Sequence, residues 1–142
     1  MDKVLIDSDV IFDSLFSREP FDRYATEIIS LCESKVIDGY LTPVIVANVY
    51  YLLRQKASHE AVVEKMNELL LVVKVLVMDK PSILRALNSK FKDFEDALQH
   101  FAATSNGKLD IILTRNLKDY KQSEIPVMTP EAYLQARASS LS

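Results

Sequence analysis

The sequence predicts an α/β fold: a three-layer sandwich in which a central, mainly parallel sheet is flanked by helices. Short apolar runs alternate with longer segments of helical periodicity along the chain. Only two glycines occur, Gly39 and Gly107, and no Ser- or Pro-rich tract divides the sequence, so we expect one domain over residues 1–142. In such folds ligands gather at the carboxyl ends of the strands, so a functional site is expected there.

The elements are expected in a regular alternation. The strand candidates are short runs rich in Val, Ile and Leu: residues 3–6, 40–42, 75–78, 111–114 and 126–128. The helix candidates repeat apolar residues every three or four positions: residues 10–16, 19–35, 44–55, 60–72, 81–89, 93–105 and 130–137.

Composition narrows the classes of function. A hydrophobic share of 49% with 26% charged residues indicates a globular rather than a disordered chain. The longest apolar stretch, residues 69–78, is broken by Lys74 and is half of what a bilayer requires, and the first residues are too short an apolar run for a signal peptide. Two glycines cannot build a glycine-rich phosphate loop. A net charge of −3 argues against a protein that coats phosphates generally, yet leaves nucleic acid open as a substrate.

The single cysteine, Cys32, cannot form an internal disulfide, so a reducing, cytoplasmic setting is the expectation. Its neighbours Ile28, Ile29 and Leu31 favour a buried structural thiol over a nucleophile.

The first acidic residues follow the first predicted strand. Asp7 emerges at the carboxyl end of that strand, and Asp9 stands two residues later. Carboxylates are rarely buried unless they are paired or bind a metal, which favours a site role for Asp7. Asp9 can belong to the site, or it can cap the next helix; the two roles remain equally open, and Ser8 is the other residue that could cap this helix.

The second acidic group lies on the predicted helix of residues 93–105. Helical geometry places Asp93, Asp96 and His100 within a narrow arc beside the apolar face. Asp96 is the candidate site residue. Asp93 and Glu95 fit the first helical turn, where the helix dipole favours negative charge, and His100 is expected at the rim or with its hydrogen bonds satisfied.

The third group follows the predicted strand of residues 111–114. Thr114 ends the strand, and Asn116 and Asp119 stand in the polar loop behind it. These two side chains can serve chemistry, or they can shape a turn by bonding to their own backbone.

The blocks LIDSDV, DFEDALQ and ILTRNLKDY, followed by IPVMTPEAYL, resemble in order and separation the signature blocks of PIN domains, in particular the VapC-like bacterial branch. The resemblance covers nearly the whole chain. It implies metal ligation by Asp7, Asp96 and Asp119, and a loop held by the hydroxyl of Thr114. Asn116 stands where many members carry an aspartate.

The same resemblance implies an activity: a Mg²⁺- or Mn²⁺-dependent endonuclease that hydrolyses RNA phosphodiesters, as the toxin of a toxin–antitoxin pair. It also implies a homodimer and a small antitoxin protein as partner. Arg115 and Lys118 are candidate contacts to the substrate phosphate; ordinary solvated surface charge is an equal alternative for each.

One block departs from the family. The helix after the second strand usually carries a glutamate, and Asn48 stands at the matching position. An amide can orient a metal-bound water but adds no negative charge, so metal affinity should fall. A PIN fold kept only as a binding module, inactive or weakly active, is therefore the main alternative.

A receiver-like signalling domain is the rival from another class, with Asp79 and Thr114 in the roles of phosphoacceptor and conserved hydroxyl. It expects a lysine at the last strand, where residues 125–129 read IPVMT, and it leaves Asp96 unexplained.

Overall fold

A computed structural model describes residues 1–141. Its centre is a five-stranded sheet in the order β3-β2-β1-β4-β5, and every neighbouring pair of strands is parallel. The strands are β1 (Lys3–Ile6), β2 (Asp38–Leu41), β3 (Lys74–Val75), β4 (Ile111–Leu113) and β5 (Val127–Met128).

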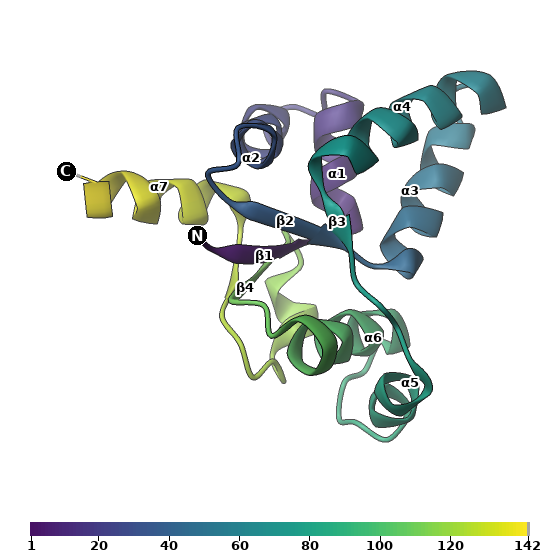
Figure 1. The fold of residues 1–142 in the computed structure, drawn as a ribbon, viewed down its shortest axis with the longest axis vertical. Coiled ribbons are helices and arrows are strands. Elements are labelled where there is room, and N and C mark those ends of the chain that lie inside the picture. The colour runs from purple at the N-terminus through teal and green to yellow at the C-terminus, as the bar shows by residue number, and fades with distance from the viewer. Residues whose placement is uncertain (142) are drawn as a thin grey trace.

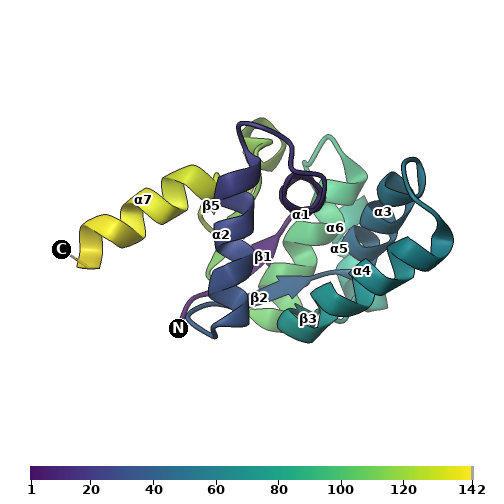
Figure 2. The ribbon, with the colours of Figure 1, turned by 90° about the horizontal axis from the view of Figure 1, so that it is seen from above.

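Helices cover both faces of the sheet. They are α1 (Ser8–Leu15), α2 (Asp22–Glu33), α3 (Pro43–Arg54), α4 (His59–Val72), α5 (Lys80–Leu87), α6 (Phe94–Ala102) and α7 (Pro130–Leu141). Helices α1 to α4 lie on one face, α5 and α6 lie on the other, and α7 extends outward beside α2 (Figures 1 and 2). The three-layer architecture predicted from the sequence is confirmed. No helix within residues 1–141 combines the length and the apolar character needed to cross a membrane.

The central strands are buried on both sides. Val4, Leu5 and Ile6 of β1 are fully buried, as are Ile112 and Leu113 of β4. Continuous apolar runs of this kind are what a parallel sheet covered by two helical layers requires, because neither face of the strand meets water.

Some predicted boundaries were wrong. The strand expected at residues 75–78 pairs with β2 only through Lys74 and Val75; the amide of Leu76 still donates to the carbonyl of Leu41 (2.8 Å) before the chain leaves the sheet for α5. The helix expected at residues 93–105 ends at Ala102 and continues as one π-helical turn.

The predicted burial of Cys32 is confirmed, since its side chain is 4% exposed and burial raises the pKa of its thiol to about 11. Gly39 of β2 faces it so closely that a Cβ atom there would lie 2.5 Å from the sulfur. A side chain at position 39 would therefore force the packing of α2 on the sheet to shift.

Candidate functional site

A cavity of about 300 Å³ opens at the carboxyl edge of the sheet, where β1 and β4 lie side by side. Its walls come from the start of α1, from α3, from α6 and from the loop after β4. The residues discussed in the sequence that line it are Asp7, Asn48, Asp96, Asn116 and Asp119, together with Asp9, Asp93 and Glu95. The fold therefore brings together side chains that lie more than 110 positions apart in the sequence.

Asp7 is the most buried of these carboxylates, with 9% of the residue exposed. It is also the N-cap of α1, because its Oδ1 accepts from the amide of Ser8 (2.8 Å). Of the two alternatives left open for Asp9, capping of this helix by Asp9 or Ser8 is therefore not the one that the structure shows. Its Oδ2 accepts from the hydroxyls of Thr114 (3.0 Å) and Tyr120 (3.2 Å). Burial, and then the charge of Asp9, raise the pKa of Asp7 to about 6.

Asp96 faces Asp7 from α6. Its backbone amide donates to the side chain of Asp93 (3.0 Å), so Asp93 caps the helix. Partial burial raises the pKa of Asp96 to about 7, with further contributions from the charges of Asp93, Asp7 and Asp119. The hydroxyl of the buried Tyr120 donates to Asp7 (3.2 Å) and lies near enough to Asp96 to oppose the rise in its pKa.

The loop after β4 is anchored by Thr114, which is fully buried. Its hydroxyl donates to Asp7 and accepts from the amide of Asn116 (3.1 Å). The loop continues into a 3₁₀ turn, η2 (Leu117–Tyr120), which supplies Asp119 to the cavity and Tyr120 to the carboxylates behind it. Lys118 is exposed on this turn and is not part of the cavity wall.

Asn48 reaches the cavity from α3. Its amide nitrogen lies 3.4 Å from the Oε2 of Glu95, a residue at the start of α6. The amide thus donates to one carboxylate of the rim and leaves its carbonyl oxygen as the group able to face a cation.

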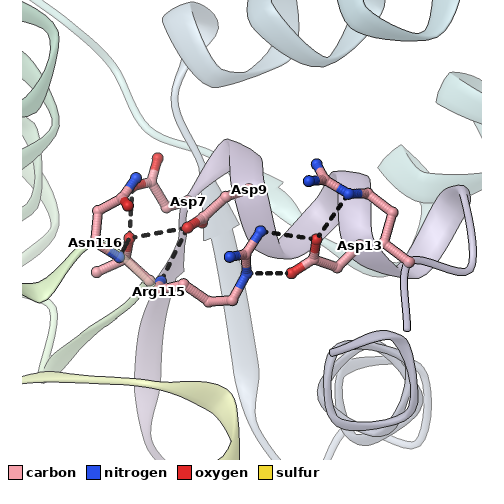
Figure 3. Close-up of polar contacts among 7 residues, drawn as sticks. Asp7, Asp9, Asp13, Arg115 and Asn116 are labelled. Atoms are coloured by element: carbon pink, nitrogen blue, oxygen red, sulfur yellow. Dashed lines mark hydrogen bonds and ion pairs between the residues drawn. The ribbon is translucent and has the colours of Figure 1, made fainter. Parts of the chain in front are cut away.

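A second network ties the loop after β4 to α1 (Figure 3). The backbone amide of Arg115 donates to Asp9 (2.9 Å), and its guanidinium donates twice to Asp13, at 2.6 and 3.1 Å. Asp13 is 1% exposed, and the Nε of Arg18 lies 3.7 Å from its Oδ1. Arg115 is therefore engaged by Asp13, outside the cavity wall, whereas Arg18 is part of that wall.

The donor set fits a hard divalent cation. Carboxylate and amide oxygens are the ligands that Mg²⁺ and Mn²⁺ prefer. Asp9 also has a buried oxygen, Oδ1, without a hydrogen-bond partner, and an uncompensated buried oxygen of this kind suits a cation. No three histidine, cysteine or acidic side chains within residues 1–141 are grouped closely enough to hold an ion on their own. Mg²⁺ commonly keeps several water ligands and needs few carboxylates.

His100 belongs to the core rather than the rim. It is 1% exposed between Phe91 and Phe101, and its Nε2 accepts from the amide of Glu124 (2.9 Å). Its Nδ1 has no hydrogen-bond partner, and burial lowers its pKa, which keeps the ring neutral.

Sequence reasoning missed three residues: Asp13, Arg18 and Tyr120. Asp13 had a signal, because it follows the apolar run Val10–Phe12 on the helix face that packs inward, and a carboxylate there needs a partner. Tyr120 had a weaker one, as the aromatic residue directly after Asp119. For Arg18 we find no signal in the sequence.

The chain is similar to a known family of proteins. A family model described as PIN domain matches residues 3–118. No curated protein matches the chain.

Solved structures share the fold at low identity. VapBC2 from Rickettsia felis, bound to a DNA fragment from its promoter, is 12% identical with a TM-score of 0.67, covering 89% of this chain and 96% of that one. A toxin–antitoxin complex from Klebsiella pneumoniae is 21% identical with a TM-score of 0.64, covering 89% and 97%. VapC20 from Mycobacterium tuberculosis, a toxin that cleaves the sarcin–ricin loop, is 14% identical with a TM-score of 0.61, covering 77% and 86%. With the family model matched over most of its length, the chain belongs to the PIN-domain family.

Proposed function

We propose that this PIN domain is a ribonuclease that hydrolyses RNA phosphodiesters with Mg²⁺ or Mn²⁺ held by Asp7, Asp96 and Asp119. The observation that carries the proposal is the shared cavity, in which two carboxyls have pKa values raised to about 6 and about 7. Negative charge crowded into a half-buried cleft is unfavourable without a cation, and it becomes useful when one is bound.

When bound, the cation would polarise the scissile phosphate and lower the pKa of a water ligand. The chain supplies position and charge around it. Thr114 and Tyr120 hold the Asp7 carboxylate by two hydroxyl donors, which fixes its orientation. Arg18, half-exposed on the cavity wall, is the cationic side chain placed to meet a phosphate oxygen, a role the sequence had suggested for Arg115 and Lys118.

The test is a comparison of RNA cleavage and thermal unfolding with Mn²⁺ and with EDTA. Millimolar Mn²⁺ is expected to raise the melting temperature by mass action and to switch on cleavage of a mixed RNA pool. Asp119→Asn should reduce both effects, whereas Asp110→Asn, an exposed aspartate at the other end of β4, should leave both unchanged. If the two variants respond to Mn²⁺ equally, Asp119 is not part of the metal site. If the wild type cleaves no RNA with Mn²⁺ or with EDTA, the proposed ribonuclease function is refuted.

The biological setting belongs to the same proposal. We propose a cytoplasmic toxin that pairs as a homodimer and binds a small antitoxin protein. The support is that several structures of the same fold are toxin–antitoxin complexes.

The alternative, a PIN fold that binds RNA without cutting it, is favoured by Asn48. Asn48→Glu tests it and is expected to tighten Mn²⁺ binding about tenfold, because a carboxylate adds a full charge beside the cation. The new carboxylate would also face Glu95, so the metal-free variant should melt below wild type, and Asn48→Glu/Glu95→Gln should recover that loss. Isothermal titration with Mn²⁺ measures the affinity. Unchanged affinity in both variants would place position 48 away from the cation.

A further inference from the structure

A second cavity, of about 210 Å³, lies on the same edge of the sheet as the candidate site. One wall is formed by Phe21 and Tyr24, at the start of α2. The others are formed by Arg115 of the loop after β4 and by Thr129, Pro130 and Glu131 at the start of α7. We propose that this cavity binds one nucleobase of a single-stranded RNA whose phosphate lies in the neighbouring acidic cavity. The inference rests on the proposed ribonuclease function and adds a subsite to it.

The position of the cavity follows from the sheet. The acidic cavity lies where β1 and β4 end, and the second lies where β4 and β5 end. The amide of Thr114 donates to the carbonyl of Met128 (3.0 Å), so the two strands still run side by side as they leave the sheet. Neighbouring β-strands are about 4.8 Å apart, so the loops that follow β4 and β5 start within the span of adjacent nucleotides of one RNA chain.

Arg115 lines the second cavity and is hydrogen-bonded through its backbone to the wall of the acidic one. Its backbone amide is bonded to Asp9, which lines the acidic cavity, and the next residue, Asn116, lines that cavity too. Its guanidinium turns the other way and lies 4.0 Å over the ring of Phe21. Because Asp13 holds that guanidinium by two hydrogen bonds, its plane is fixed before any ligand arrives.

The chemistry of the walls suits a base better than a sugar or a phosphate. Bases stack on aromatic rings and on arginine planes, and here Phe21, 39% exposed, lies under Arg115 with Tyr24 beside it. The exposed carboxylate of Glu131, which accepts from the hydroxyl of Tyr24 (3.2 Å), would repel a phosphate and can accept from a base N–H. The volume is below the roughly 300 Å³ at which sites for larger ligands begin, so one flat ring system is the expected occupant.

Base stacking can be separated from cleavage by measuring binding in EDTA. The probe is a short, fluorescein-labelled single-stranded RNA of mixed sequence, followed by fluorescence anisotropy. Phe21→Leu keeps an apolar cover on Arg115 but removes the aromatic face, and it is expected to weaken binding at least about fivefold. Tyr51→Leu is the matched control, because Tyr51 is 68% exposed on α3 and lines neither cavity, and it should bind as wild type does.

Crosslinking tests the same contact on the wild-type protein, so its result does not depend on whether a variant folds. An RNA carrying photoreactive 4-thiouridine is expected to crosslink wild-type protein at Phe21, Tyr24 or Arg115. Equal binding by Phe21→Leu and Tyr51→Leu, or crosslinks confined to other residues, would overturn the subsite. If binding depends on Phe21 but no Mn²⁺-dependent cleavage is seen, the subsite stands and the ribonuclease function is refuted. If the protein cleaves RNA with Mn²⁺ but Phe21→Leu changes neither RNA binding nor the cleavage rate, the ribonuclease function stands and the subsite is refuted.

Discussion

Replacing Asp96 with asparagine is expected to lower metal-dependent RNA cleavage at least about 100-fold, since even the outer partners of a metal site typically contribute 10- to 100-fold. Asparagine keeps the size of the side chain and one oxygen but removes the charge that faces Asp7 and Asp119. The Mn²⁺-induced rise in melting temperature should shrink in parallel. Asp110→Asn serves as the control, because that exposed side chain accepts from the amide of Lys3 and an amide oxygen can do the same.

The same substitution should make the metal-free protein more stable at neutral pH. The pKa of Asp96 is raised from 3.8 to about 7 in the folded state, so its carboxyl favours folding below pH 4 and that contribution is lost as the pH rises through 7. An asparagine side chain does not ionise, so Asp96→Asn loses no stability at this position over this pH range. In EDTA, the melting temperature of Asp96→Asn minus that of wild type should therefore grow between pH 5 and pH 8. A constant difference would mean that the folded carboxyl ionises normally, and the crowding of charge in the cavity would have to be abandoned.

Asp13→Asn should reduce the free energy of unfolding by about 3 kcal/mol, near the lower end of what breaking a buried ion pair costs. Asp13 is 1% exposed and receives two hydrogen bonds from Arg115, whose side chain is 24% exposed. Removing the negative partner leaves the guanidinium partly desolvated without a counter-charge. The lower end of the range applies because Arg115 retains some contact with water.

Urea unfolding of a double-mutant cycle measures this pair. In an Arg115→Met background, Asp13→Asn is expected to cost less than about 1 kcal/mol, because no charge is left unpaired. Arg18→Ala gives the contrast: its side chain is 49% exposed and 3.7 Å from Asp13, so its removal should cost under about 1 kcal/mol. Additive effects of the Asp13 and Arg115 substitutions would show that the two side chains do not stabilise each other.

The sequence was informative where local pattern decides the outcome. The alternation of strands and helices predicted the layers, and the rule that ligands gather at strand ends predicted one edge for Asp7 and for the loop that carries Asp119. Asp96 was expected from its place on a helix face, and Asn48 from the resemblance to PIN domains. The end of β3 was missed because apolar residues 75–78 look the same whether or not a neighbouring strand continues beside them. Pairing depends on the partner, which local pattern does not contain.

Side-chain partnerships were beyond reach for a related reason. Arg115 and Asp13 are 102 positions apart, and nothing in either segment indicates the other. The interpretation of Arg115 as a phosphate contact treated its charge as free, whereas the structure gives it a buried partner. For Asp7, the sequence predicted a place at the end of a buried strand. It did not predict that the same side chain both caps α1 and lines the cavity, because that depends on how the chain packs around it.

The sheet ends on each side in a strand of only two residues, β3 and β5. An edge this short presents almost no row of free backbone groups for a further strand to pair with, and Lys74 adds a charge at the β3 edge. The apolar segments that could form fibrils, such as β1, lie at the centre of the sheet with partners on both sides. Among residues 1–141, the sheet therefore offers almost no template for aggregation through added strands, and such aggregation is expected to begin from a chain that has already opened.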